Sequence, residues 1–265
     1  MRVIIADNAT EVANIAAKKV ASVFRQTRAG GRTPVFGLAT GSSPIGTYEA
    51  LAELRKAGEF DTDGIVAFAL DEYVGLDYSH PESYHAVIHR TVTEPLGLEH
   101  KNVHVPDGLA ADLRAACESF EDAITEAGGV DLQLLGIGTN GHIGFNEPTS
   151  SLNSRTRFKT LAPQTRVDNA RFFDSLDQVP LHCLTQGIGT ILDARQVVLV
   201  AQGEAKAAAV AAMIEGPLSS MCPASALQLH RDALVVIDRP AAKRLQLLDY
   251  YRHINRYQPA ELEKY

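Results

Sequence analysis

The chain has 265 residues, 45% hydrophobic and 22% charged, which is ordinary for a globular protein and enough for one large α/β domain or two small ones. Its formal net charge of -7 argues against a nucleic-acid-binding protein, whose surface would be basic. No apolar run approaches the ~20 residues that span a bilayer, and Asp7 comes too early for a signal peptide. Three widely spaced cysteines (Cys117, Cys183 and Cys222) indicate neither a disulfide framework nor a zinc site. We therefore expect a cytoplasmic protein without a membrane or nucleic-acid partner.

Short apolar runs alternate with longer amphipathic ones along the chain. The short runs predict strands at residues 3–6, 35–38, 65–70, 131–137, 197–201 and 234–237. The amphipathic patterns predict helices at 11–25, 45–57, 81–91, 112–127, 204–215 and 241–255. Apolar strands that alternate with helices are typical of a mostly parallel sheet covered on both faces. We expect one open, Rossmann-like α/β domain over residues 1–265.

The loop Thr40-Gly41-Ser42-Ser43-Pro44 follows the second predicted strand. Ligands bind at the carboxyl ends of the strands in such a sheet. Serine is a favoured N-cap and proline a favoured first helical residue, so the next helix should begin at about Pro44. Backbone N–H groups, hydroxyls and the positive end of that helix then predict an anion site that suits phosphate. The alternative is a well-capped helix without a ligand.

Two further loops carry charged residues where a predicted strand ends. Asp71 and Glu72 follow strand 65–70, where partial burial would raise a carboxyl pKa and suit it to general-base work. The alternative is a capping residue beside a solvated acid. Lys206 follows strand 197–201 in the first turn of the next helix, where a cation is unfavourable without an anion. This position favours ligand binding, against the alternative of a solvated lysine.

The glycine-rich loop at 136–148 contains Asn140, His142 and Glu147. Glycine allows tight turns and close approach of the backbone to a ligand, and histidine moves protons near neutral pH. We therefore predict an active-site loop. Gly136-x-Gly138-x-x-Gly141 also matches a dinucleotide-binding pattern, but Pro148 and polar residues follow where that pattern needs a helix, and no ribose-binding acid follows.

Two other clusters have plainer interpretations. His85 and His89 have the spacing of zinc-binding helices but lack the intervening glutamate and a third ligand, so we expect no metal. Arg155, Arg157 and Lys159 form a basic cluster after the glycine-rich loop. The cluster is either a solvated face or a second anion site.

Taken together, the loops resemble the glucosamine-6-phosphate deaminase family. The resemblance covers nearly the whole chain, in order and almost without gaps. It is carried by Thr-Gly-Ser-Ser-Pro (40–44), Leu-Asp-Glu-Tyr-Val-Gly-Leu (70–76), His-Pro-Glu-Ser-Tyr (80–84), Gly-His-Ile-Gly-Phe-Asn-Glu-Pro (141–148), Ser-Arg-Thr-Arg-Phe-Lys-Thr (154–160), Arg-Phe-Phe (171–173) and Leu-Gln-Leu-His (227–230).

The resemblance implies conversion of glucosamine 6-phosphate and water to fructose 6-phosphate and ammonium, without a cofactor, in N-acetylglucosamine catabolism. It implies that Asp71 carries a proton between C2 and C1 of the open-chain sugar, that His142 assists ring opening, and that Glu147 orients the histidine. The implied phosphate ligands are Thr40, Gly41, Ser42, Ser43, Arg171 and Lys206. Residues from about 161 to 182 resemble a mobile lid, so we expect closure over substrate.

The chain departs from many members at Asn140, where they carry Asp and others carry Asn. An amide can accept a hydrogen bond from an imidazole but cannot stabilise an imidazolium with a full charge. Our hypothesis is that His142 depends mainly on Glu147 and that Asn140 orients the histidine.

Some relatives are hexamers activated by N-acetylglucosamine 6-phosphate at a subunit interface. The basic part of that site resembles Ser150, Arg157, Lys159 and Thr160 of this chain. The aromatic part aligns poorly, with Tyr250 and Tyr251 as its candidate sources. The resemblance thus implies a homo-oligomer with a second anion site.

Two other functions are consistent with parts of the pattern. A 6-phosphogluconolactonase shares the fold and the phosphate loop but does not need Asp71 as a carbon base. A non-catalytic sugar-phosphate sensor does not need Asp71, His142 and Glu147 together. Release of ammonium from glucosamine 6-phosphate separates these functions from the deaminase.

Overall fold

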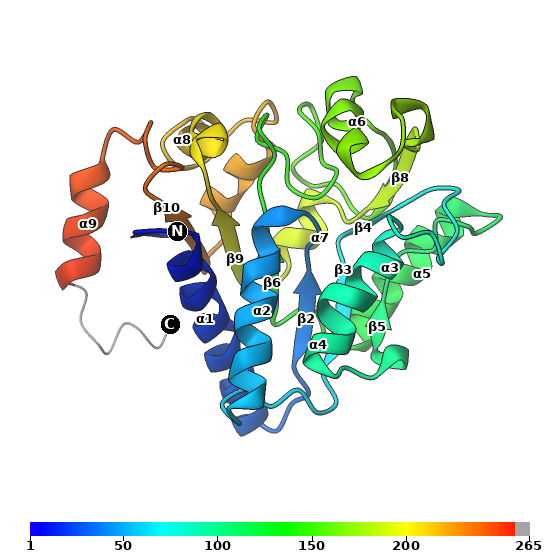
Figure 1. The fold of residues 1–265 in the computed structure, drawn as a ribbon, viewed down its shortest axis with the longest axis horizontal. Coiled ribbons are helices and arrows are strands. Elements are labelled where there is room, and N and C mark those ends of the chain that lie inside the picture. Colours follow the sequence, from blue (N-terminus) through cyan, green and yellow to red (C-terminus); the bar gives the residue numbers. More distant parts are fainter. Residues whose placement is uncertain (258–265) are drawn as a thin grey trace.

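A computed structural model describes residues 1–257 and contains a seven-stranded parallel sheet at its centre (Figure 1). In spatial order the strands are β1 (Arg2–Ala6), β10 (Ala233–Asp238), β9 (Gln196–Ala201), β6 (Leu132–Leu135), β2 (Val35–Leu38), β3 (Val66–Ala69) and β5 (Val103–His104). The six predicted strands all occur in this sheet, which confirms the open α/β fold.

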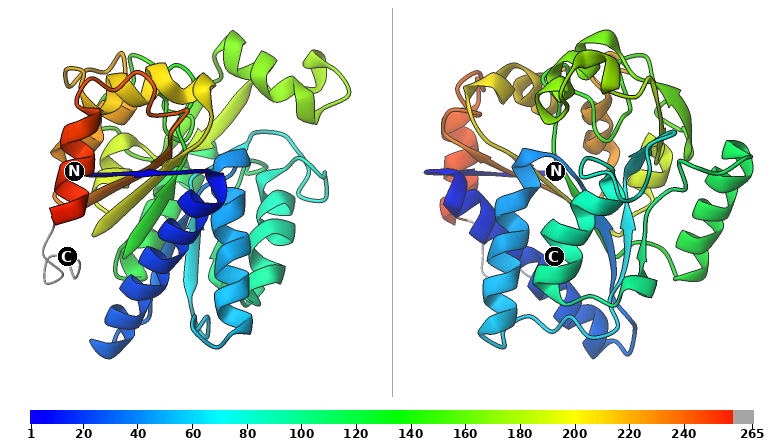
Figure 2. Two further views of the ribbon diagram at one scale, coloured as in Figure 1. Left: turned by 60° about the vertical axis from the view of Figure 1, so that its left-hand side comes forward. Right: turned by 45° about the vertical axis from the view of Figure 1, so that its right-hand side comes forward.

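Helices cover both faces of the sheet because successive strand residues point to opposite faces. In β6, Leu134 packs into the apolar cluster that includes α1 and α2, and Leu135 packs into the cluster on the other face. The helices of the first face are α1 (Ala9–Ala29), α2 (Ser42–Lys56), α3 (Tyr84–Ile88), a π-helical turn (His89–Thr93) and α4 (Glu94–Leu96). The other face holds α5 (Leu113–Glu126), α7 (Ile188–Leu192), α8 (Ala207–Ile214) and a 3₁₀ helix (Pro223–Leu229). Figure 2 shows α1 and α2 side by side.

The order of the strands reverses between β6 and β2. From β2 the chain adds β3 and β5 toward one edge, and from β6 it adds β9 and β10 toward the other. Ligands bind in open α/β sheets at such a reversal, beyond the carboxyl ends of the strands. The four loops singled out in the sequence follow β9, β6, β2 and β3, which are adjacent strands around this point.

A second, antiparallel sheet stands beyond the carboxyl ends of the first. It consists of β4 (Asp71–Tyr73), β8 (His182–Thr185) and β7 (Arg157–Thr160), with Asp71 opposite Thr185. Between β7 and β8 the chain forms α6 (Pro163–Asn169) and 3₁₀ turns at Ala170–Phe172 and Leu176–Gln178. The predicted strand 65–70 is therefore two elements, because the chain passes from β3 into β4 at Leu70.

Three predicted helices differ from the structure. The predicted helix 45–57 begins earlier, at Ser42, and the predicted helix 81–91 begins at Tyr84, where Ser83 accepts a hydrogen bond from the Ala86 N–H. The predicted helix 241–255 is wrong over its first seven residues, which form a turn and an irregular loop, and α9 (Leu248–Tyr257) follows them. Within residues 1–257 no helix has both the length and the apolar character needed to cross a membrane.

Candidate active site

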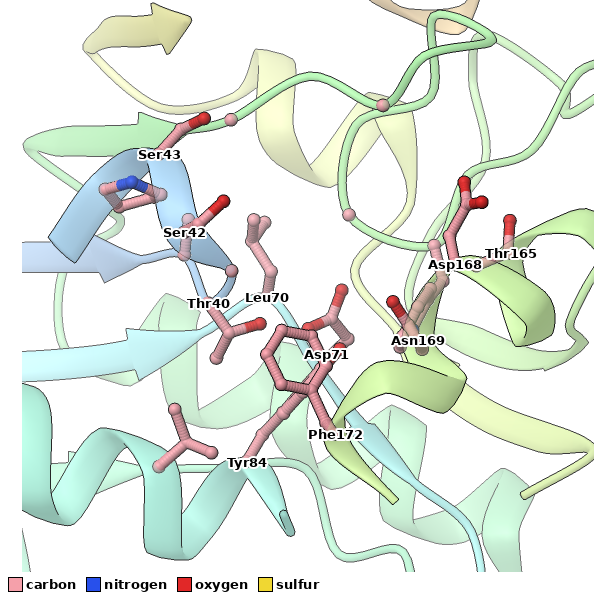
Figure 3. A pocket seen from close by; sticks show the side chains of 18 of the residues that line it. Thr40, Ser42, Ser43, Leu70, Asp71, Tyr84, Thr165, Asp168, Asn169 and Phe172 are labelled. Carbon is pink, nitrogen blue, oxygen red and sulfur yellow. The ribbon is translucent and has the colours of Figure 1, made fainter. Parts of the chain in front are cut away.

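A cavity of about 610 Å³ opens at the carboxyl ends of the central strands. In Figure 3, Thr40, Ser42 and Ser43 lie on one side, and Thr165, Asp168 and Asn169 of α6 lie opposite, with Asp71 between them. The residues of the sequence prediction that line the cavity are Thr40, Gly41, Ser42, Ser43, Asp71, His142, Arg171 and Lys206. The structure therefore brings the predicted phosphate ligands and two predicted catalytic residues to one place.

One side of the cavity is the N-terminus of α2, where the sequence predicts a phosphate site. The N-cap is Gly41, with φ of 91° and ψ of 175°, and within residues 1–257 no side chain caps this helix end. This corrects the expectation that a serine caps the helix and that Pro44 begins it. The hydroxyls of Ser42 and Ser43 do not cap the helix. Both residues line the cavity beside the N–H groups of the first turn. Such a helix end attracts an anion.

Two cations face the same space. Lys206 ends a 3₁₀ turn (Glu204–Lys206) directly before α8. The sequence predicts it in the first turn of the helix itself. Arg171 comes from the segment after α6, and its guanidinium carbon lies 4.6 Å from the centre of the Phe172 ring. Burial lowers the pKa of Lys206, and the charge of Arg171 lowers it further. An anion bound between Lys206 and Arg171 would relieve that repulsion.

Asp71 lies on the floor of the cavity and is 4% exposed. Burial raises its pKa well above the ordinary value, and the nearby Glu72 raises it further. Glu72 is fully buried and accepts hydrogen bonds from the N–H groups of Tyr73, Tyr84 and His85 at 2.7–2.9 Å. Neither acid is solvated, so the alternative interpretation of this pair is wrong. A backbone hydrogen bond with Phe145 partly offsets the rise in the pKa of Asp71, and Glu72 holds the neighbouring backbone.

Asn140, His142 and Glu147 lie together at the edge of the cavity. Glu147 Oε2 is 3.6 Å from His142 Nδ1 and accepts a hydrogen bond of 2.8 Å from Asn140 Nδ2. Asn140 Oδ1 accepts from the His142 backbone N–H at 3.2 Å, so the amide contacts the backbone and not the imidazole. Burial alone would raise the pKa of Glu147, but His142, Thr165 and Asn140 lower it to about 2. Glu147 is thus an anion beside the histidine.

A glycine in this loop makes room for the His142 side chain. A Cβ on Gly138 would lie 2.2 Å from His142 Cε1 and would clash with the ring, whereas a Cβ on Gly144 would lie 3.1 Å from Thr185 Oγ1 and only in contact with Asp71 Oδ2 at 3.4 Å. In the described chain no helix begins at Gly141. Ile143 and Asn146 form an isolated β-bridge there instead. Gly138 therefore makes room for the histidine, and the helix that a dinucleotide site needs is not present at Gly141 in the described residues.

The sequence does not predict several of the lining residues, because their positions depend on contacts between distant segments. Tyr73 and Tyr84 pack with ring centres 4.9 Å apart, and burial raises the pKa of both. Asn169 Nδ2 donates to the Tyr73 hydroxyl at 2.9 Å, and Thr165 Oγ1 donates to Glu147 Oε1. Tyr84 belongs to the motif His-Pro-Glu-Ser-Tyr (80–84), but no local sequence pattern indicates a role for Thr165 or Asn169.

The structure divides the predicted second anion site. Arg157 and Lys159 are half-buried on one face of β7, whereas Thr160 is exposed on the other, with Oγ1 3.3 Å from His182 Nδ1. Ser150 is 4% exposed, and its Oγ has no hydrogen-bond partner within residues 1–257. Arg155 forms ion pairs of 2.5 Å with Glu121 and Asp193 and is not a free cation.

Comparison with known proteins identifies the family. The chain matches glucosamine-6-phosphate isomerases/6-phosphogluconolactonase over residues 7–236. It is 56% identical over 252 residues to a glucosamine-6-phosphate deaminase of Cutibacterium acnes, covering 95% of each chain. It is 55% identical over 262 residues to one of Streptomyces coelicolor, covering 98% of each chain.

Solved structures agree with these matches. A structure described as a monomeric glucosamine-6-phosphate deaminase has a TM-score of 0.88 and 42% identity, covering 92% of this chain and 99% of that one. A 6-phosphogluconolactonase from Trypanosoma cruzi has a TM-score of 0.75 over 92% and 97% of the two chains, but at 18% identity it shows only a shared fold. The chain belongs to the glucosamine-6-phosphate isomerase/6-phosphogluconolactonase family, among its glucosamine-6-phosphate deaminases.

Proposed function

We propose that the protein converts glucosamine 6-phosphate and water to fructose 6-phosphate and ammonium. The observation that carries this proposal is Asp71, a buried carboxyl with a raised pKa, in one cavity with His142 and an uncapped helix N-terminus. An aldose–ketose conversion needs a base that reaches two adjacent carbons, and a carboxylate on one face of the sugar can serve both.

The phosphate is held by the amides and hydroxyls of residues 40–43 together with Arg171 and Lys206. Arginine can contact a phosphate through two parallel hydrogen bonds, which fixes its direction. The binding energy from this end of the sugar positions the reacting carbons over Asp71.

His142 gives a proton to the ring oxygen as the sugar opens and later to the leaving amine, with anionic Glu147 beside it. Asp71 removes the C2 proton of the open-chain sugar, and O1 regains the proton that it lost in ring opening, which gives an enolamine. Asp71 then returns its proton to C1, which leaves an imine at C2. Water then adds to the C2 imine, and the C2–N bond breaks to leave the ketose and ammonium. Burial makes ionised Asp71 a stronger base than a solvated carboxylate.

A 6-phosphogluconolactonase would use the phosphate loop but has no carbon–hydrogen bond to break. A sensor domain would need neither the raised pKa of Asp71 nor the pairing of His142 with Glu147. The identities of 55–56% to deaminases also favour the deaminase over both alternatives.

The decisive test is ammonium release from glucosamine 6-phosphate by the purified protein. Asp71→Asn should lower kcat on the order of 10²–10⁴-fold, the usual effect of losing a general base. Binding of the sugar phosphate to Asp71→Asn should persist, because Asp71 is not a phosphate ligand. Wild-type turnover in Asp71→Asn would contradict the role of Asp71, and hydrolysis of 6-phosphogluconolactone without ammonium release would favour the lactonase.

We also propose that residues 161–182 act as a lid on a single domain that comprises the rest of the chain. Support comes from Thr165, Asn169 and Arg171, which belong to this segment and line the cavity. Closure would exclude water from the proton transfers and bring Arg171 to the phosphate. A cytoplasmic role in N-acetylglucosamine catabolism is consistent with this activity.

We propose that Ser150, Arg157 and Lys159 bind N-acetylglucosamine 6-phosphate as an effector in a homo-oligomer. Support comes from the unpartnered hydroxyl of Ser150 within the described chain and from Arg157, whose pKa burial lowers. Thr160 is excluded from the same face of β7 by the alternation of its side chains.

A further inference from the structure

One face of α6 makes two side-chain contacts outside the lid. Thr165 and Asn169 are four residues apart, so they lie on the same side of the helix. Thr165 donates a hydrogen bond to Glu147, and Asn169 donates one of 2.9 Å to Tyr73. The first contact reaches the carboxylate beside His142, and the second reaches only the floor of the cavity.

We propose that Thr165 is a positioning residue that holds Glu147 against His142 when the lid is seated. This inference rests on the proposed deamination, because it assigns the lid a part in preparing the histidine. The lid would then complete the catalytic group as well as cover the substrate.

The surroundings of Glu147 carry the argument. Glu147 is 7% exposed, so its oxygens depend on donors from the protein. Oε2 has Asn140 Nδ2 at 2.8 Å and His142 Nδ1 at 3.6 Å. Within residues 1–257, Thr165 Oγ1 is the only donor to Oε1. The hydroxyl thus fixes the carboxylate from the side opposite the histidine.

Lifting α6 would remove that donor and leave one oxygen of a buried carboxylate unsatisfied. Such a group does not keep its orientation, because turning toward water or toward another donor lowers its free energy. Rotation of Glu147 would take Oε2 away from His142. Thr165 and Asn140 therefore hold the two oxygens of the carboxylate together, and Thr165 is itself 4% exposed and lines the cavity.

A purely structural role for Thr165 makes a different prediction. Valine has the shape of threonine without the hydroxyl, so packing alone would tolerate Thr165→Val. Asn169→Ala loosens the same helix without touching Glu147. Val167→Ala changes an exposed residue of α6 that does not line the cavity and serves as the control.

The test measures kcat and KM for ammonium release from glucosamine 6-phosphate. Thr165→Val should lower kcat roughly ten-fold with little change in KM, since the contact orients a catalytic group. Thr165→Ser keeps the donor and should recover kcat to within about two-fold of the wild type. Asn169→Ala should raise KM more than it lowers kcat, and Val167→Ala should match the wild type.

A second readout does not depend on which sugar phosphate is turned over. The ¹⁵N-histidine NMR signals of His142 should change in Thr165→Val and return in Thr165→Ser. Wild-type kcat in Thr165→Val, equal loss in Thr165→Ser, or unchanged His142 signals would each overturn the proposal. Absence of ammonium release by the wild type would instead refute the proposed function, and the NMR signals would still decide the role of Thr165.

Discussion

Asp71 and Glu147 are carboxyl groups of one site whose surroundings move their pKa values in opposite directions. Burial and the neighbouring Glu72 raise the pKa of Asp71, whereas donors around Glu147 lower its pKa to about 2. Divergent surroundings of this kind mark different roles for like groups. Asp71 is suited to exchange a proton with a ligand, and Glu147 is suited to remain an anion beside His142.

The raised pKa of Asp71 has a consequence for stability. The folded state favours its protonated form, so its contribution is fully present below the ordinary pKa of 3.8 and is lost as pH rises through the folded-state pKa. Asp71→Asn, which is always neutral, should therefore raise the Tm at pH 7, on the order of 2–4 °C for about 1 kcal/mol in a domain of this size.

Thermal unfolding followed by circular dichroism from acid to neutral pH measures this gain. The gain should shrink as pH falls toward 3.8, where wild-type Asp71 is protonated as well. Asp122→Asn, at an exposed position on α5, is the control and should change the Tm little at any pH. A Tm for Asp71→Asn at or below that of the wild type at pH 7 would contradict the effect.

Asn140→Asp tests the departure at Asn140. The substitution replaces the 2.8 Å hydrogen bond to Glu147 with two facing carboxylates, which cannot both ionise easily. One proton of the pair should then bind at higher pH, and the acid limb of the kcat/KM profile should move up by on the order of one unit. Stopped-flow ring opening and the pH profile measure this, and no change in either would deny Asn140 a distinct role.

At the scale of elements, α2 connects the phosphate site to the fold. Gly41 and Gly58 stand at its two ends with φ of 91° and 75°, and a Cβ on either would meet nothing within 4 Å. An alanine at either position therefore costs backbone strain and no clash. Only Gly41 adjoins the cavity, where its backbone shapes the anion site.

Gly41→Ala should destabilise the protein by about 1–3 kcal/mol and raise the KM for glucosamine 6-phosphate roughly ten-fold or more, because its backbone angles are nearly confined to glycine. Gly58→Ala should cost stability by the same mechanism and leave KM unchanged. Urea unfolding and steady-state kinetics on both variants check this. Equal KM values in the two variants would contradict a role of the Gly41 backbone in phosphate binding.

Elements with a local pattern were predictable, and those with distant partners were not. Six of the seven strands of the parallel sheet are apolar runs that the sequence predicts, whereas the two-residue edge strand β5 has no such run and was missed. β4 was not, because its three residues pair with β8 more than 100 positions away. The start of α9 depends on Glu215, whose carboxylate accepts from the N–H groups of Gln246 and Leu247 at 2.8 and 2.9 Å. No sequence pattern near residue 248 predicts the contact with Glu215.

The site was predictable to the same extent. Strand ends showed where Thr40, Asp71 and Lys206 would meet, because neighbouring parallel strands end at one edge of the sheet. The role of Asn140 was placed on the imidazole, whereas its amide contacts Glu147 and the backbone. Contacts from the lid, such as that of Thr165, depend on how α6 folds back over the sheet.

At the scale of the whole molecule, the proposed effector site and its candidate aromatic partner lie at opposite ends. α9 packs on the edge strand β1, where Asn255 Nδ2 donates to the Val3 carbonyl at 2.5 Å. β7 belongs to the second sheet, next to β8, across the molecule (Figure 1). Tyr250 is 57% exposed on α9. In Figure 1, α9, which carries Tyr250 and Tyr251, lies on the opposite side of the sheet from β8, the neighbour of β7.

An aromatic ring from α9 can therefore complete the site of Ser150, Arg157 and Lys159 only on a neighbouring copy. Activation by N-acetylglucosamine 6-phosphate is expected in an oligomer and not in a monomer, and one similar deaminase is described as monomeric. Sedimentation velocity should show association, and the effector should raise apparent substrate affinity about 5–150-fold, the usual range of such coupling.

Tyr250→Ala and Arg157→Met should each weaken that response without abolishing basal turnover, because neither residue lines the catalytic cavity. Dilution to a monomer should remove the response in the wild type. Linkage adds a reciprocal requirement, since substrate must tighten effector binding by the same factor. Hyperbolic kinetics that the effector leaves unchanged in an oligomer would refute the second site, and activation of a monomer would refute the part assigned to α9.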